Sequence, residues 1–216
     1  MNPTHLKLYV DSFWLSPYAF CCFVALREKG LGFEIGEIAL HEGEQRKAGY
    51  ADRSLTQKVP ALEHDGFWLS ESMAIAEYLE EAFPPPQFQA VLPVDLRERA
   101  RARQVMSWIR SDLLALREER SSRTMFYPGK VEALTPRARE AADKLLRVAG
   151  LLIGPGTETL FGAWCLADAD LAFLLHRLIL NADEVPAPVL AYARAQWKRP
   201  SIREFVEHPR APFVPY

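Results

Sequence analysis

Cysteine is scarce in this chain: three occur among 216 residues, and two of them, Cys21 and Cys22, are adjacent. A disulfide framework needs several separated cysteines, and a redox-active pair needs the spacing CxxC, so the sequence predicts neither. The five histidines do not have the spacing of metal ligands either. We therefore expect no structural disulfide and no metal site.

Long apolar runs are also missing. No stretch of about 18 apolar residues occurs, and the first residues do not combine a basic segment with a long apolar one. The sequence thus indicates neither a membrane-spanning helix nor a signal peptide, and we expect a cytoplasmic protein without a membrane partner. The formal net charge of −2 argues against a nucleic-acid partner.

The composition is that of a globular protein, with 49% hydrophobic and 25% charged residues and no low-complexity tract. A chain of this length can form one large domain or two small ones. Prolines, 16 in all, help to locate the boundaries of helices and strands.

The N-terminal stretch Leu6–Leu31 reads LKLYVDSFWLSPYAFCCFVALREKGL. Its alternating start predicts a strand over 6–10, followed by an irregular turn and then a helix. Ser16 is a favoured N-cap, Pro17 is well tolerated as the first helical residue, and Gly30 is a common helix terminator. A serine at a helix N-terminus can also face a bound anion, either a phosphate or a thiolate, although most such serines are only caps.

The next residues continue a pattern of mixed strands and helices. Residues 32–40 alternate as a second strand, which would pair in parallel with the first after the helical crossover. Residues 41–58 predict a loop with a short helix near 44–50. A short strand over 59–63 and another over 67–69 form a hairpin, and a helix follows over 71–82. The pattern is βαβ followed by ββα.

The segment Phe83–Phe88 contains three consecutive prolines and separates this half from one with only helical periodicity. We predict domains over 1–83 and 95–216, joined by a linker over 84–94. Helices are expected over 95–120, 135–152, 187–197 and 201–207, with a buried apolar helix after residue 166. In the helix over 95–120, the side chains expected to face inward are Val105, Met106, Ile109, Leu113 and Leu116, and the arginines expected in solvent are Arg97, Arg99, Arg101 and Arg103.

Four short motifs occur in order: Ser16-Pro17-Tyr18, Val59-Pro60, Glu71-Ser72 and Ala167-Asp168. Together with SPYAFCCFVALREKGL, SESMAIAEYLE, RARARQ and ADADLAFLLHRL, they resemble the cytosolic glutathione S-transferase family, in a bacterial branch with a serine-type site. The resemblance covers nearly the whole chain. It implies the fold class α/β plus all-α, with an N-terminal thioredoxin-like domain followed by an all-helical domain that forms the pocket for the acceptor substrate.

The resemblance also implies glutathione as the co-substrate and assigns its binding residues. Val59, before a cis Pro60, would pair its backbone N–H and C=O with the cysteinyl residue of glutathione. Ser72 and the first turn of its helix would bind the γ-glutamyl carboxylate, and Glu71 the amine. Lys58 would reach the glycyl carboxylate, unless it is only a solvated lysine.

Ser16 is the catalytic residue that the resemblance implies, as the donor of a hydrogen bond to the glutathione sulfur. Because Ser16 lies where thioredoxins have CxxC, glutathione must bring the sulfur. The rival activator is Tyr9 on the first strand, since other branches of the family use a tyrosine near that position, but strand alternation could equally bury it.

The helical half offers a structural cap and the candidates for an acceptor pocket. Asp168 is expected to accept from the N–H of Cys165, which stands where the family usually has Ser or Thr, and so to be structural. The candidates for the pocket, whose residue types are more often found in a core, are Trp14, Met106, Arg110, Phe126 and Trp164.

The sequence therefore predicts a glutathione transferase, expected to be a homodimer, that activates the glutathione thiol for attack on a small hydrophobic electrophile or a peroxide. A glutathione-dependent peroxidase or disulfide-bond reductase is an alternative, because the same thiolate can attack oxygen or sulfur. A binding module that keeps the fold without turnover is another.

Overall fold

The computed structural model describes residues 5–127 and 129–215. They form two compact units: the chain up to Val91 together with the residues from Pro200 onward, and Leu92–Arg199. The domain limits 1–83, 84–94 and 95–216 stay a prediction. The compact units are divided differently, because residues 84–91 of the predicted linker and the last helix belong to the first unit.

The first unit is built on a four-stranded sheet. Its strands are β1 (Leu6–Asp11), β2 (Glu34–Ile38), β3 (Ala61–His64) and β4 (Phe67–Ser70), in the order β2-β1-β3-β4. Strand β1 pairs in parallel with β2 and antiparallel with β3, which forms a hairpin with β4. The predicted βαβ unit and hairpin are confirmed.

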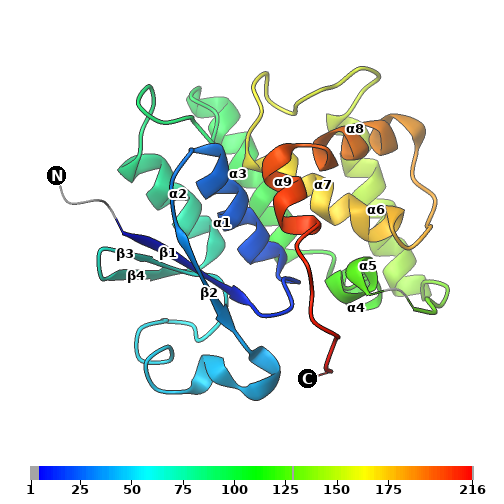
Figure 1. The fold of residues 1–216 in the computed structure, drawn as a ribbon. Helices are drawn as coiled ribbons and strands as arrows, with labels where there is room; N and C mark the ends of the chain where they lie inside the picture. Colours follow the sequence, from blue (N-terminus) through cyan, green and yellow to red (C-terminus); the bar gives the residue numbers. More distant parts are fainter. Residues whose placement is uncertain (1–4, 128, 216) are drawn as a thin grey trace. The chain divides into compact units, whose positions relative to one another are not determined.

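Helices α1 (Pro17–Glu28) and α2 (Ser72–Ala82) lie together on one side of this sheet, and α9 (Pro200–Val206) packs against α1 (Figure 1). The alternating residues Leu6, Leu8 and Val10 of β1 are buried, as a half-covered strand requires. Helix α1 is apolar on most sides, and nearly all of it is buried, as expected of such a helix.

Segment 39–58 covers the opposite face of the sheet (Figure 1). The short helix expected near 44–50 is present in part, as the 3-10 helix η2 (Glu44–Arg46). A second 3-10 helix, η1 (Leu40–Glu42), precedes it, and the left-handed Gly43 lies between the two. Beyond them, the ring of Tyr50 packs edge-on against Tyr9 and Trp68, which project from the sheet.

A buried ion pair holds the linker against the first unit. Lys29 Nζ lies 2.7 Å from Glu80 Oε2, and the two side chains are 0% and 4% exposed. Lys29 also donates to the carbonyls of Phe83 and Gln89, and Glu80 accepts from the N–H of Val91. The backbone of the proline-rich segment is thus hydrogen-bonded to two charged side chains, Lys29 just after α1 and Glu80 in the last turn of α2.

The second unit is helical, with α7 at its centre. Its elements are α3 (Leu96–Ser111), α4 (Leu114–Glu119), α5 (Ser122–Phe126), α6 (Pro136–Leu152), α7 (Leu166–Ile179) and α8 (Ala187–Trp197). Every residue from Leu166 to Leu178 is buried, and α7 packs on α3, α5 and α8, so the predicted buried helix is confirmed. No helix in the part of the chain that the structure describes is both long and apolar enough to span a membrane.

The single helix predicted over 95–120 is wrong, because the chain breaks after Ser111. Leu113 has a left-handed φ of 62° and separates α3 from α4. The carboxylate of Asp112 accepts from the Leu113 N–H and from the indole of Trp108, and pairs with Lys144. These local bonds compete with helix continuation. The five apolar residues expected to face inward are nevertheless buried.

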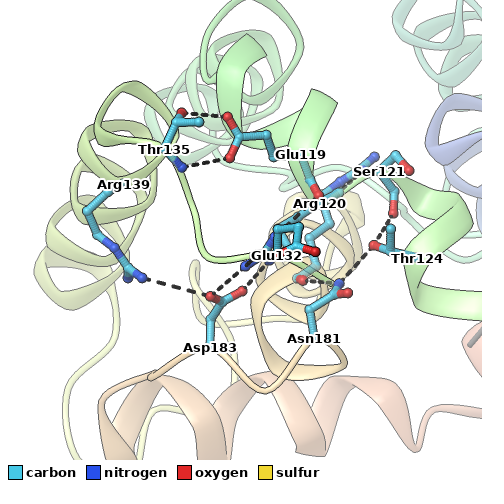
Figure 2. A network of polar contacts seen from close by, with 10 residues as sticks. Glu119, Arg120, Ser121, Thr124, Glu132, Thr135, Arg139, Asn181 and Asp183 are labelled. Atoms are coloured by element: carbon cyan, nitrogen blue, oxygen red, sulfur yellow. Dashed lines mark hydrogen bonds and ion pairs between the residues drawn. The ribbon is translucent and has the colours of Figure 1, made fainter. Parts of the chain in front are cut away.

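A network of polar contacts ties the end of α4 to the segment before α6 and to the turn after α7 (Figure 2). Arg120 donates to both carboxylate oxygens of Asp183, at 2.6 and 3.1 Å, and to the carbonyl of Glu132. Glu119 accepts from the hydroxyl and the N–H of Thr135, which is the N-cap of α6. These contacts fix the end of α4, the segment before α6 and the turn after α7 relative to one another.

Candidate active site

The predicted glutathione-binding residues meet at one edge of the sheet in the first unit. In the pairing register, Tyr9 lies opposite Ala61, and Ala61 lies opposite Ser70. The end of β1, the start of β3 and the end of β4 therefore lie at the same end of the strands, which forms this edge of the sheet. Helices α1 and α2 both begin there, and the thiol of Cys22 on α1 lies 3.9 Å from the carbonyl of Ser72.

Ser16 is the N-cap of α1, as predicted. Its Oγ accepts from the N–H of Ala19 at 3.2 Å, and Pro17 occupies the first turn. A hydroxyl that accepts through a lone pair still has its proton to donate. Ser16 can therefore donate to an anion placed at the positive end of the α1 dipole.

The turn that leads to Ser16 is wrapped around Asp11, which is 1% exposed. The carboxylate of Asp11 accepts from the N–H groups of Leu15 and Ser16, both at 2.8 Å, and its carbonyl accepts from the N–H of Trp14. Burial raises the pKa of Asp11, and the two amide hydrogen bonds oppose that rise. Trp14 has a left-handed φ of 54°, so the turn is held in an unusual backbone conformation.

The loop before β3 presents the predicted backbone partner for a peptide. The bond between Val59 and Pro60 is cis, as predicted. The carbonyl of Lys58 accepts from the hydroxyls of Tyr50, at 2.6 Å, and Ser54, while the side chain of Lys58 is exposed. Two side chains of segment 39–58, those of Tyr50 and Ser54, thus fix the backbone of the loop at Lys58.

Glu71 and Ser72 open α2 at the same edge. Glu71 is exposed and has a left-handed φ of 73°, and Ser72 is buried as the first helical residue. The N-cap residue, Glu71, makes no capping hydrogen bond with its side chain. A helix start can bind a negatively charged group through the backbone N–H groups of its first turn.

Tyr9 lies on the opposite face of the sheet from α1. Its hydroxyl donates to Glu63 Oε2 at 2.9 Å, and its ring stacks on Trp68 with centroids 4.6 Å apart. Burial and the hydrogen bond to Glu63 raise the pKa of Tyr9 well above its usual value. The phenol is committed to a carboxylate, which does not favour it as a donor to a thiolate.

The residues predicted for the acceptor pocket are packed within their own units. In the first unit, Trp14 is 4% exposed and donates through its indole N–H to Glu37 at 2.8 Å. In the second, Met106 is fully buried, and Arg110 Nη1 lies 2.5 Å from Asp170. Their place in an acceptor pocket stays a prediction, as does that of Phe126 and Trp164.

The predicted hydrogen bond from the Cys165 N–H to Asp168 is present at 2.9 Å. Asp168 also accepts from the Leu160 N–H and from the hydroxyl of Tyr192. It lies inside the helical unit, fully buried, and its contacts are those of a structural residue.

Sequence reasoning missed Asp11, Tyr50 and Ser54, which hold the backbone of the candidate site. An acidic residue that ends an apolar strand was a usable signal for Asp11. Nothing local distinguished Tyr50 or Ser54, because their partner is a carbonyl four to eight residues further along the chain.

The chemistry available at this edge is hydrogen bonding to anions rather than covalent attack by the protein. All three cysteines are buried. Among the described residues, no group of three or more His, Cys, Asp or Glu side chains is placed to hold a metal ion. A sulfur nucleophile would have to arrive with the bound molecule.

Models of two families match the chain. Residues 5–81 match "Glutathione S-transferase, N-terminal domain", and residues 95–209 match "Glutathione S-transferase, C-terminal domain". Among solved structures, a glutathione transferase homologue from Burkholderia BGR1 with bound glutathione is 42% identical. The superposition has a TM-score of 0.77 and covers 94% of this chain and 96% of the homologue.

More distant relatives match over shorter stretches. A maleylacetoacetate isomerase from Dictyostelium discoideum is 36% identical over 115 residues, or 52% of this chain and 51% of that protein. Glutathione S-transferase U28 from Arabidopsis thaliana is 36% identical over 103 residues, which is 48% of this chain and 44% of the relative. The chain thus spans about half the length of these two relatives.

Proposed function

This chain belongs to the glutathione S-transferase family, and we propose that it is a glutathione transferase that uses Ser16 to stabilise the glutathione thiolate for attack on a small electrophile. The observation that carries the proposal is the position of Ser16. Its hydroxyl accepts from Ala19 and retains a proton to donate, at the N-terminus of a buried helix.

The energies involved are sufficient. Lowering a thiol pKa from about 8.5 to about 6.5 requires about 2.7 kcal/mol. A helix N-terminus contributes about 0.3–2 kcal/mol to an adjacent anion. A hydrogen bond to a charged group contributes about 1.5–3 kcal/mol. Ser16 and the α1 dipole together therefore account for a thiolate at neutral pH.

The remaining parts of glutathione find suitable groups at the same edge. An extended cysteinyl residue can pair with the backbone of Val59, whose N–H and C=O are bonded to no other described residue. The γ-glutamyl carboxylate suits the backbone N–H groups in the first turn of α2 and the hydroxyl of Ser72. Glu71 suits the amine, and Lys58 the glycyl carboxylate.

The bound thiolate can attack more than one kind of atom. Attack on carbon gives conjugation, attack on a peroxide oxygen gives peroxidase activity, and attack on a disulfide sulfur gives disulfide reduction. The name of the Dictyostelium relative, maleylacetoacetate isomerase, adds isomerisation to the reactions worth testing. We place conjugation first and propose the others as alternatives, together with a binding module without turnover.

The test has two stages. The protein should be retained on immobilised glutathione and eluted by free glutathione. Turnover is then measured with an aryl halide, cumene hydroperoxide, hydroxyethyl disulfide and a cis-enone acid. Retention with turnover of any one substrate supports an enzyme and names its reaction. Retention without turnover of any substrate replaces the enzyme with the binding module, and failure to bind glutathione contradicts the whole proposal.

We also propose a homodimer, on the expectation stated from the sequence. Light scattering coupled to size-exclusion chromatography measures it directly. A mass of 24.5 kDa, that of a single chain, would contradict it.

A further inference from the structure

The C-terminal segment reaches the turn that carries Ser16, and both lie within the first unit. Arg210 Nη2 donates to the carbonyl of Trp14 at 3.2 Å. The same guanidinium donates to the carbonyls of Phe205, Val206 and His208, at 2.9–3.1 Å, so one side chain caps the end of α9 and binds the turn.

The ring of Trp14 is packed against residues of the same C-terminal segment. The imidazole of His208 stacks on it, with centroids 3.7 Å apart and planes 17° apart, and Phe205 packs at 5.1 Å. On the sheet side, the indole donates to Glu37. The left-handed backbone of Trp14 is therefore fixed at its carbonyl by Arg210 and at its ring by residues from two elements.

We propose that Arg210 is a positioning residue for thiol activation: it fixes the turn between Asp11 and Ser16 through the Trp14 carbonyl and contributes a positive charge to that turn. This inference rests on the proposed function of Ser16. It concerns a residue outside the matched family regions, which end at residue 209.

The geometry gives Arg210 two effects on the Ser16 hydroxyl. The carboxylate of Asp11 accepts from the amides of Leu15 and Ser16, and Arg210 donates to the carbonyl of Trp14. The orientation of Ser16 at the N-cap therefore depends on both side chains. A guanidinium is well suited to bind several carbonyls at once, because its five N–H groups have a fixed, planar arrangement.

The second effect is electrostatic. Two carboxylates are bonded to the turn: Asp11 accepts from the amides of Leu15 and Ser16, and Glu37 on β2 accepts from the indole of Trp14. Burial raises the pKa of Asp11, the backbone hydrogen bonds oppose that rise, and the charge of Arg210 opposes it to a smaller extent. Negative charge near a thiolate disfavours it, so the cation that offsets Asp11 favours ionisation of a thiol bound at Ser16.

The experiment compares Arg210→Met with the wild type, using glutathione itself as the probe. Ultraviolet absorbance of the thiolate gives the pKa of the bound thiol, and fluorescence or calorimetry gives the dissociation constant. Arg210→Met should raise the thiol pKa by about 1 and lower kcat near neutral pH about threefold, in step with the smaller thiolate fraction. The glutathione dissociation constant should change less than about threefold, because the peptide contacts lie on other segments.

Two further variants separate the effects and provide the control. Arg210→Lys keeps the charge but not the planar set of donors, so it should restore part of the thiol pKa shift. Arg203→Gln removes a cation of α9 that pairs only with Glu207 among the described residues and should leave the thiol pKa unchanged.

The outcomes are distinguishable. If the wild type lowers the thiol pKa and the folded Arg210→Met variant lowers it equally, the role of Arg210 is refuted and that of Ser16 stands. If the wild type binds glutathione without lowering its thiol pKa, the proposed function fails and this inference fails with it. Should Arg210→Met not fold, an Arg210→Lys variant with unchanged thiol pKa and kcat refutes the positioning role.

Discussion

Tyr192 on α8 donates a hydrogen bond of 2.6 Å to Asp168 on α7, inside the helical unit where both side chains are buried. The same carboxylate accepts from the N–H groups of Leu160 and Cys165, at 2.8 and 2.9 Å. One buried side chain thus accepts hydrogen bonds from the N-cap of α7, from the turn before it and from a hydroxyl of the neighbouring helix. Burial raises the pKa of Asp168, and these hydrogen bonds oppose that rise.

The first prediction follows from this contact. Asp168→Ala leaves two backbone N–H groups and a phenol without their acceptor, so it should lower the free energy of unfolding by about 3 kcal/mol or more. Tyr192→Phe removes a single donor and should cost about 1–2 kcal/mol. Urea denaturation measures both. Glutathione affinity should be nearly unchanged in each variant, and an unmoved midpoint for Asp168→Ala would contradict the structural role.

The second prediction concerns the buried pair between Lys29 and Glu80. Lys29→Met leaves the carboxylate buried without its cation, and should cost about 3–5 kcal/mol. The double variant with Glu80→Leu should cost less than the sum of the two single changes, because no charge is then left unpaired.

Chemical denaturation of the two single variants and the double variant gives the coupling energy. Lys130→Gln is the matched control, since Lys130 and its partner Glu132 are 85% and 78% exposed, and its midpoint should stay at the wild-type value. Strictly additive losses at Lys29 and Glu80 would show that the pair is not a unit.

The third prediction is a pH dependence caused by His176. Burial lowers the pKa of this histidine to about 4, and its ring stacks on Trp197 with Nδ1 2.8 Å from the Ala172 carbonyl. In the unfolded chain the pKa is about 6.5. As the pH falls below that value, the unfolded state binds a proton that the folded state does not, so stability is lost.

The loss should amount to about 2 kcal/mol between pH 7 and pH 5, and it should level off below about pH 4. Unfolding free energies at several pH values measure it. His176→Leu removes the titrating group and should reduce the difference between pH 7 and pH 5 by about the same amount. An equal pH dependence in the variant and the wild type would exclude His176 as the cause.

The fourth prediction tests the proposed role of Ser16 in activating the thiol. Ser16→Ala should raise the pKa of bound glutathione by about 1–2, the effect of losing one hydrogen bond to a charged group. Turnover near neutral pH should fall about 10- to 100-fold and recover in part as the pH rises. Ser16→Thr keeps the hydroxyl and is the control, which should retain most of the activity.

Tyr9→Phe decides between the two activators. It should leave the thiol pKa near the wild-type value, because the Tyr9 hydroxyl already donates to Glu63. If Tyr9→Phe abolishes the lowered thiol pKa while Ser16→Ala does not, the assignment of Ser16 is wrong and Tyr9 is the activator.

The sequence by itself determined the order of the elements and the residues that begin them. Alternation of apolar residues located the strands, and cap-then-proline pairs located the starts of α1 and α6, because these signals depend only on neighbours within a few residues. The motif residues Ser16, Val59 and Glu71 could be singled out for the same reason. The break in the helix predicted over 95–120 did not show in the apolar pattern. Asp112 is bonded there to its neighbours Trp108 and Leu113, but also to Lys144, which is 32 residues away.

Only the tertiary structure decided which groups hold the candidate site in place. Asp11 could be seen as a charge at a strand end, but its role depends on a turn that folds back over its carboxylate. Arg210 is 196 residues from the carbonyl of Trp14 that it binds, and the proline-rich tail around it gives no local signal. The assignment of α9 and the linker to the first unit likewise depends on the contacts of α1 and on the buried charge of Lys29. Such contacts join segments that are distant in sequence, so no local pattern encodes them.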